Sequence, residues 1–382
     1  MGFGIAPQDN YILNKSPGIG YISTIEWPLV LSLLASWVLV FICLIRGTKS
    51  FSKVVYFTVI FPYVILLILG IRGWMLPGAS KGILFYIRPV FSKLLDARVW
   101  NDAANQIFFV LSVSYGGLIT LSSYNRFNQN TLSNTLIITI TNVITSIFAG
   151  FVIFAFLGYL AYITGQEVTS VVTEGPGLAF VIYSFAVTTL PGAPLWSILF
   201  FLMLIALGTS TVLVSVDTIT TVFTDQFNSL RPYKTFLTLI ACVIMFLLGL
   251  VLCTDAGIYW LELLDRFIGS WTALTIALLE CICIAYVYGG NNFRSNIQSM
   301  FGSNHFAVKT YRIFQFCWLF ATPALLAALI VFTFVGYRRL HLGPYIYPQW
   351  AMYLGWGLTG LIMSGAVLWA FYSILSVLIQ RK

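Results

Sequence analysis

The chain has 382 residues, of which 59% are hydrophobic and only 8% are charged, and its mean hydropathy is +0.92. A soluble domain could not keep that much apolar surface from aggregating, so the composition predicts an all-α polytopic membrane protein. The net charge of +8 does not indicate a nucleic-acid partner, because the basic residues are scattered through the loops.

A polar segment, Met1–Thr24, precedes the first apolar span. It has no basic region followed by an apolar core and is therefore not a signal peptide, and we interpret residues 1–26 as part of an extracellular loop. Residues 27–382 then form a single transmembrane domain with nine spans of bilayer length. The predicted spans are Trp27–Ile45, Val54–Ile71, Trp100–Ser123, Leu136–Ile163, Phe200–Asp225, Phe236–Cys253, Leu264–Tyr288, Tyr311–Val335 and Tyr347–Ile379.

Two of the connections are long enough to carry structure of their own. Arg72–Val99 alternates apolar and basic residues, which predicts a short surface helix. Thr164–Pro194 is marked by Gly and Pro, which predicts a re-entrant or surface hairpin. If the N-terminus is outside, the cytoplasmic loops carry slightly more Lys and Arg than the outer loops. This excess favours an outside N-terminus and a cytoplasmic C-terminus. An outside N-terminus is compatible with N-glycosylation at Asn14, in the sequon Asn14-Lys15-Ser16.

Three consecutive hydroxyl residues, Thr209, Ser210 and Thr211, lie in the middle of the fifth span. Hydroxyl and carbonyl oxygens are what a membrane helix needs to replace the water of a dehydrated cation. Hydroxyls at this depth are also commonly bonded back to the carbonyls of their own helix. Both interpretations remain open from this stretch alone.

Polar and small residues also interrupt the third and fourth spans. Near the middle of the third span, Ser112, Ser114 and Gly116 predict a point at which the helix could open and expose carbonyls to a cavity, or a close packing of helices. In the fourth span, Asn142 and Ser146 stand four residues apart on one face, where they could coordinate an ion or bridge two helices.

Charged residues near or within the spans are further candidates. Asp265 and Arg266 could form part of a charged gate or be solvated at the interface, and Asp225 could pair with a cytoplasmic base or face water. Glu280 lies deeper, where a carboxylate is expected to have a buried partner. An enzyme is not indicated, because catalytic triad, metal-ligand and phosphate-binding patterns are missing. The six cysteines all lie in apolar spans, which indicates neither a disulfide framework nor a zinc site.

Several long strings identify a family resemblance, among them IEWPLVLSLLASW, WNDAANQIFF, SYNRFNQN, TSIFAGFVIFAFLGYLA, EGPGLAF and YPQWAMYLGW. With them, the chain resembles the neurotransmitter:sodium symporters, which carry amino acids and monoamines with sodium and often chloride. That family has twelve helices built on an inverted five-plus-five repeat plus two more. The nine spans resemble its helices four to twelve, so the resemblance implies an N-terminally truncated chain that lacks the first three.

The resemblance implies two sodium sites. The second site of the family would use the Leu207 carbonyl and the hydroxyls of Ser210 and Thr211. The first would draw on Asn142 and on residue 110, where the family has Ser or Thr. Val110 stands there instead and offers only its backbone carbonyl.

The resemblance also implies a chloride site, a substrate site and two gates. The chloride positions are Gln106, Asn142 and Ser146, although the hydroxyl that the family supplies at residue 110 is missing. The substrate contacts are Phe109, Val110, Ser112, Tyr115 and Thr211. Asp265 matches the acid of the outer gate and Asp225 that of the inner gate, near which Tyr124 also lies.

These matches lead to two hypotheses of different class. In the first, the protein is a sodium-coupled symporter of amino acids or related amines that works by alternating access in the plasma membrane, with the use of chloride and any homo- or hetero-oligomer left open. In the second, it is a non-transporting truncated isoform or degenerate relative that acts, if at all, by associating with intact transporters. The second is motivated by the missing helices, by Val110, and by Ser184 and Phe185, which stand where the family has Pro and Glu.

Overall fold

The computed structural model describes residues 14–45, 48–171, 187, 191–301, 311–335, 339–343 and 345–380. The chain forms two compact units, each assembled from separate stretches of sequence. The first unit comprises Met1–Lys15, Ser23–Val90 and Ile137–Asp255. The second comprises Ser16–Ile22, Phe91–Leu136 and Ala256–Lys382. The two units do not test the predicted partition into an outer loop, residues 1–26, and a transmembrane domain, residues 27–382, which stays a prediction.

Among the described residues, eight helices are long and apolar enough to cross a membrane. They match eight of the nine predicted spans and confirm an all-α polytopic membrane protein. The exception is the third span, which is divided into α5 (Ala97–Val110) and α6 (Gly117–Ser123). Between them, Ser112, Ser114 and Gly116 have φ values of 50°, 70° and 75°, which a right-handed helix cannot accommodate. The prediction of one continuous third helix is therefore wrong, and the predicted opening of that helix is confirmed.

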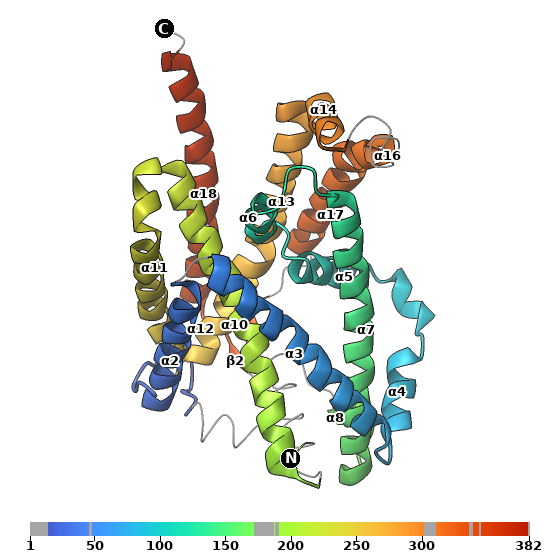
Figure 1. The fold of residues 1–382 in the computed structure, drawn as a ribbon. Coiled ribbons are helices and arrows are strands. Elements are labelled where there is room, and N and C mark those ends of the chain that lie inside the picture. The colour runs from blue at the N-terminus through green and yellow to red at the C-terminus, as the bar shows by residue number, and fades with distance from the viewer. Residues whose placement is uncertain are drawn as a thin grey trace. The chain divides into compact units, whose positions relative to one another are not determined.

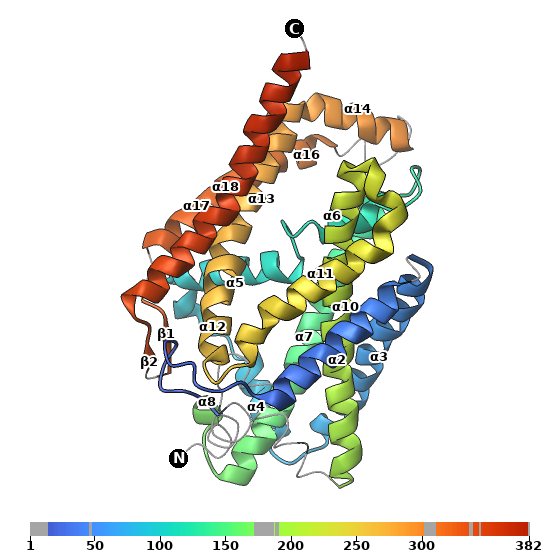
Figure 2. The same ribbon diagram turned by 90° about the vertical axis from the view of Figure 1, so that its left-hand side faces the viewer.

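The first unit is built around two pairs of helices (Figure 1). Helix α3 (Thr48–Trp74) packs along α10 (Ala193–Gln226), and α2 (Trp27–Leu44) packs along α11 (Lys234–Gly249) (Figure 2). The unit also contains most of α7 (Thr131–Thr164) and the shorter elements α4 (Ala79–Ile87), α8 (Val168–Val171), η4 (Asn228–Tyr233) and η5 (Leu250–Cys253). Its main core joins α3, α7 and α10 through side chains that include Leu69, Val152 and Phe156, each 0% exposed.

One end of the first unit is fixed by a buried carboxylate. Asp255 is 4% exposed and accepts hydrogen bonds from the amide and hydroxyl of Ser23, the latter at 2.6 Å. Next to it, the amide of Glu26 donates to the Cys253 carbonyl at 3.0 Å, and Ile25 and Thr254 form an antiparallel bridge. These bonds hold the chain that leads into α2 against the end of η5.

Helix α4 confirms the short helix that the sequence predicted after the second span, and glycines hold it against α7. A Cβ on Gly82 would fall 2.7 Å from the Gly158 amide nitrogen and closer still to the Phe154 carbonyl oxygen. Tyr86 packs beside this contact, with its ring stacked on Phe154 at a centroid distance of 4.8 Å. The two backbones can approach this closely only because neither glycine carries a side chain.

Replacing Gly82 with alanine is therefore expected to destabilise the protein by at least the roughly 1–3 kcal/mol typical of overpacking, because backbone atoms rather than a flexible side chain must move. Thermal unfolding of the detergent-purified protein measures the loss. Gly360→Ala is the matched control: a Cβ there meets nothing within 4 Å, so it should unfold at or slightly above the wild-type temperature. Equal melting temperatures for Gly82→Ala and Gly360→Ala would contradict the close contact.

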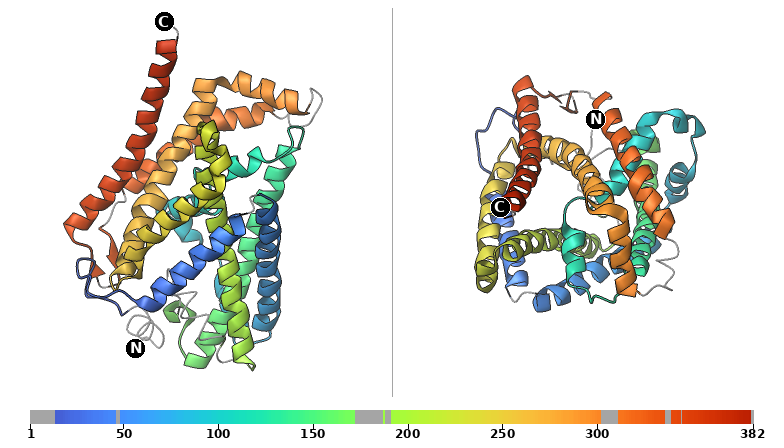
Figure 3. Two further views of the ribbon diagram at one scale, coloured as in Figure 1. Left: turned by 60° about the vertical axis from the view of Figure 1, so that its left-hand side comes forward. Right: turned by 90° about the horizontal axis from the view of Figure 1, so that it is seen from above.

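The second unit contains long helices that are interrupted by π-helical turns. One runs through α12 (Gly257–Leu264), η6 (Asp265–Thr272), α13 (Ala273–Ile282), η7 (Cys283–Gly289) and α14 (Gly290–Phe301). The other runs through α16 (Tyr311–Phe316), η8 (Cys317–Ala321) and α17 (Thr322–Val335). The remaining elements are η2 (Phe91–Leu95), a hairpin of β1 (His341–Leu342) and β2 (Tyr345–Ile346), and α18 (Gln349–Gln380), which Figure 3 shows as one unbroken red helix.

An aromatic cluster fixes the η6 turn from one side. Phe267 is 0% exposed and Trp271 is 4% exposed, and both rings pack edge-on against Trp356 of α18. Trp271 also meets Phe334 of α17 at a centroid distance of 4.3 Å. The opposite side of the same turn, which carries Asp265 and Arg266, remains exposed.

Candidate functional site

The hydroxyl cluster lies in the middle of α10, where two side chains converge on one carbonyl. Ser210 Oγ donates to the Leu207 carbonyl oxygen at 2.8 Å, and Thr211 Oγ1 donates to the same oxygen at 3.3 Å. The hydroxyls are thus bonded to their own helix, as the simpler interpretation expects. Each hydroxyl uses only its proton in this bond and keeps lone pairs that could bind a cation. Three oxygens therefore stand together on one side of the helix.

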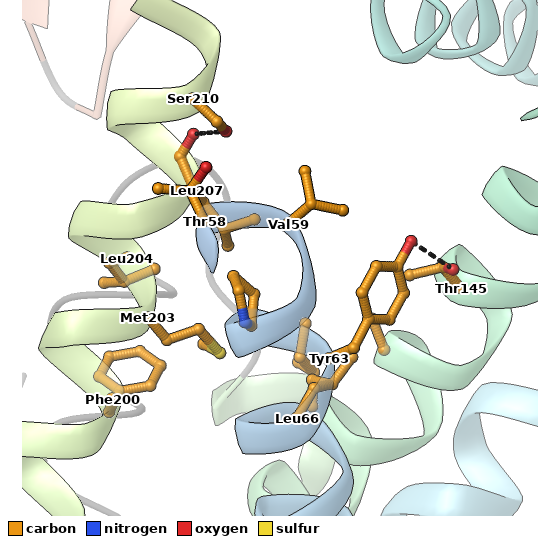
Figure 4. A pocket seen from close by; sticks show the side chains of 13 residues that line it. Thr58, Val59, Tyr63, Leu66, Thr145, Phe200, Met203, Leu204, Leu207 and Ser210 are labelled. Carbon is orange, nitrogen blue, oxygen red and sulfur yellow. Dashed lines mark hydrogen bonds between the residues drawn. The ribbon is translucent and has the colours of Figure 1, made fainter. Parts of the chain in front are cut away.

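A pocket of about 520 Å³ opens beside this cluster, within the first unit (Figure 4). Its walls come from α3, α7 and α10, and Leu207 and Ser210 line one end. Most of the remaining wall is apolar, with Met203 and Phe200 along α10. The hydroxyls of Tyr63 and Thr145 are hydrogen-bonded to each other at 3.2 Å across the opposite side. The pocket has the volume of a small-molecule site.

The break between α5 and α6 leaves the carbonyl oxygen of Val110 outside the helical ladder. A helix that ends at Val110 has four carbonyls without intrahelical partners, those of residues 107–110. The amides of Leu111, Val113 and Ser112 bond to the first three of them, at 3.0–3.2 Å. Among the described residues, no backbone amide bonds to the carbonyl of Val110. This is the carbonyl that the family resemblance implies for the first sodium site, where the side-chain ligand is missing.

The predicted substrate residues of this break lie at the surface of the second unit. Phe109 is 57% exposed and Val110 is 37% exposed, and Ser112 is exposed on its strained turn. Tyr115 reaches the π-helical turn, where its hydroxyl donates to the Gly269 carbonyl at 3.3 Å. Asp265, the predicted outer-gate acid, begins that same turn. The structure therefore brings Tyr115 and the turn with the acid together within one unit.

The predicted chloride residues are divided between the two units. Asn142 is half-buried and Ser146 exposed, and they lie one turn apart on α7 in the first unit. Gln106 is exposed on α5, in the second unit. The sodium residues are divided in the same way, with Val110 in the second unit and the other four positions in the first.

The predicted gate residues have simple surroundings. Asp225, at the end of α10, lies 3.8 Å from Arg231, and both side chains are more than 60% exposed, so it pairs with a base and also faces water. Tyr124 caps the C-terminus of α6. Glu280 is half-buried, and its side chain forms no ion pair or hydrogen bond with another described residue, so the predicted buried partner is not found there. Ser184 and Phe185 of the predicted hairpin lie outside the described residues.

Comparison with known proteins decides the family. The family model described as "Sodium:neurotransmitter symporter family" matches residues 8–378. The chain belongs to this family. The resemblance read from the sequence strings is thereby confirmed, and so is its consequence that the chain comes from a family of transporters rather than enzymes.

Curated relatives in the symporter family match nearly all of this chain. The chain is 44% identical to the sodium- and chloride-dependent glycine transporter 2 of Xenopus laevis, over 94% of its own length and 44% of that protein. It is 46% identical to the mouse sodium- and chloride-dependent neutral and basic amino acid transporter B(0+), over 91% of its length and 55% of that protein. For the human B(0+) transporter the identity is 45%, over 92% and 56%. The chain thus spans about half the length of the curated relatives it matches.

Sequence reasoning missed one partly buried ion pair in this chain. Asp217, two turns beyond Ser210 on α10, lies 3.1 Å from Lys234 Nζ, and its side chain is 9% exposed. Lys234 also donates to Thr221 Oγ1 at 3.3 Å. The signal that could have found it is a carboxylate within an apolar span, which is costly without a partner. Nothing in the sequence identified the first residue of α11 as that partner.

Proposed function

We propose that the full-length protein is a sodium-coupled symporter that moves amino acids or related amines across the plasma membrane by alternating access, with chloride as a second ion. The observation that carries the proposal is the interrupted α5–α6 helix, whose Val110 carbonyl is outside the helical ladder, in a chain of the symporter family. An interrupted membrane helix of this kind is how transporters offer backbone oxygens to ions and substrates. The relatives named above depend on sodium and chloride and carry amino acids, which favours an amino acid over a monoamine.

In this proposal Leu207, Ser210 and Thr211 supply oxygens to one sodium ion, and Asn142 and Val110 supply oxygens to a second. The chloride ion is held by Gln106, Asn142 and Ser146. The substrate contacts Phe109, Val110, Ser112, Tyr115 and Thr211, while Asp265 and Asp225 act in the outer and inner gates with Tyr124 near the latter. Ions and substrate drive uptake together because both stabilise the same occluded state.

The orientation is part of the proposal. An outside N-terminus places Asn14 where it could carry a glycan, and the structure leaves this residue exposed. Ser16 of the same sequon is buried, and its hydroxyl donates to the Gly18 carbonyl at 3.1 Å, so glycosylation would have to precede the docking of this segment. The C-terminus is then cytoplasmic.

Uptake of labelled amino acids by cells that express the full-length protein tests the proposal. Glycine, leucine and lysine are compared in sodium chloride, in choline chloride and in sodium gluconate, with surface expression measured by biotinylation. We expect uptake of at least one of them to fall by about tenfold or more in choline, and to fall in gluconate as well. A protein that reaches the surface yet shows no sodium-dependent uptake of any substrate would support the non-transporting alternative.

A further inference from the structure

A hollow of about 430 Å³ lies beside α4, in the first unit and away from the site described above. The apolar part of α3 that precedes α4 runs from Val54 to Trp74 and has 21 residues. At 1.5 Å per residue it is about 31 Å long, which matches the hydrocarbon thickness of a bilayer. Helix α4 begins just beyond this span and runs back along α7, with Gly82 close to Gly158 and Tyr86 close to Gly150, so its first turn lies near the end of the hydrocarbon.

One face of α4 has a cation at each end and apolar side chains between them. Lys81, Leu84, Phe85 and Arg88 follow the spacing i, i+3, i+4, i+7, which places them on one side of the helix, and all four line the hollow. Gly82 and Tyr86 occupy the side that packs on α7, and the Phe85 ring also meets Phe154 of α7 at a centroid distance of 6.0 Å. Lys81 and Arg88 are both exposed, and neither side chain forms an ion pair with another residue of the described part of the chain.

The facing wall comes from the end of α7 and the residues that follow it. Tyr162 contributes an exposed ring, and Glu167 contributes a carboxylate whose Oε2 accepts a hydrogen bond from Thr169 Oγ1 at 3.2 Å. The hollow thus has two cations on one wall, a carboxylate with an aromatic ring on the other, and apolar surface between them. That is the charge pattern of a site for a zwitterion with an apolar body.

We propose that this hollow binds the headgroup of a zwitterionic phospholipid from the adjacent leaflet. The phosphate lies between Lys81 and Arg88, whose Cα atoms are separated by about 10.5 Å along the helix axis, and long basic side chains can approach a group between them from both ends. The ammonium group lies toward Glu167 and the Tyr162 ring, and the acyl chains leave along Leu84 and Phe85. An anionic lipid fits less well, because Glu167 would then face a second negative charge.

The test measures binding of dioctanoylphosphatidylcholine to the delipidated full-length protein in detergent, as a concentration-dependent rise in melting temperature. We expect Lys81→Gln/Arg88→Gln to weaken the apparent affinity by about tenfold or more, since each basic residue near a lipid surface contributes to the attraction. Lys93→Gln/Arg98→Gln removes the same charge from exposed positions of the same connection and should leave the affinity unchanged. Equal affinities for the two double variants would overturn the proposal.

Three further probes separate the headgroup from other causes. Dioctanoylglycerol, which lacks a headgroup, and glycerophosphocholine, which lacks tails, should each give little or no rise in melting temperature. A rise with either that equals the rise with phosphatidylcholine would overturn the proposal, in favour of a tail site or a soluble-anion site. Glu167→Gln should shift the preference from dioctanoylphosphatidylcholine toward dioctanoylphosphatidylglycerol, and an unchanged preference would remove the zwitterion from the proposal. None of these readouts depends on transport.

Discussion

Replacing Lys234 with methionine is expected to destabilise the protein by about 3 kcal/mol. Asp217 is 9% exposed on its side chain and lies 3.1 Å from the Lys234 ammonium, so the substitution leaves a buried carboxylate without that cation. A carboxylate in an apolar span is costly to keep charged once its counter-ion is removed. The loss is measured as a lower melting temperature and a lower yield of monodisperse protein in size-exclusion chromatography.

Two further variants distinguish this effect from a general loss of charge. Asp217→Leu/Lys234→Met removes both partners and should recover most of the stability, because an apolar pair of similar volume avoids the desolvation of two ions. Arg231→Gln removes the cation of the nearby Asp225 pair, in which both side chains are more than 60% exposed at 3.8 Å, and should cost at most about 1 kcal/mol. A Lys234→Met protein as stable as Arg231→Gln would show that the Asp217 pair has no structural role.

The sequence predicted those parts of the fold that depend on local pattern. Long apolar runs are sufficient to identify eight spans, because a membrane helix satisfies its backbone within its own segment. The opening near Ser112, Ser114 and Gly116 was predictable for a related reason, since small residues in mid-span reduce the cost of leaving the helix. The prediction of one continuous helix was wrong at this point. An apolar run indicates burial in lipid but gives no information on the backbone dihedral angles at which a helix breaks.

Contacts between distant segments could not be predicted in the same way. Gly82 lies in α4 and Gly158 in α7, with α5 and α6 between them in the sequence. Each glycine alone resembles an ordinary small residue in an apolar helix. Asp217 and Lys234 meet only because the η4 turn sets where α11 begins. The ion-site residues illustrate the limit most clearly: Ser210 and Thr211 converge on Leu207 within one helix, whereas Val110 belongs to the other unit, and its role rests on family resemblance.

Replacing the two convergent hydroxyls with Ser210→Ala/Thr211→Val is expected to raise the sodium concentration for half-maximal uptake by about tenfold or more. Each lost oxygen removes one contact to a charged partner, and such contacts are worth about 1.5–3 kcal/mol. Ser210→Ala only removes a hydroxyl, and Thr211→Val replaces a hydroxyl with a methyl group of similar size. The apolar wall around Ser210 in the 520 Å³ pocket is therefore preserved. Uptake is measured against sodium concentration at fixed surface expression, with choline as the replacement cation.

Thr209→Val is the matched control for this experiment, because it removes a hydroxyl from the same helix turn that is not among the oxygens converging on Leu207. It should leave the sodium dependence unchanged. If Ser210 and Thr211 served only to satisfy the Leu207 carbonyl, the double variant would behave like Thr209→Val, since an α-helical carbonyl already has its own amide partner. The geometry of the hydroxyl cluster is compatible both with a cation site and with hydroxyls that only bond to their own helix. Weaker sodium dependence of uptake in the double variant alone therefore indicates a cation site.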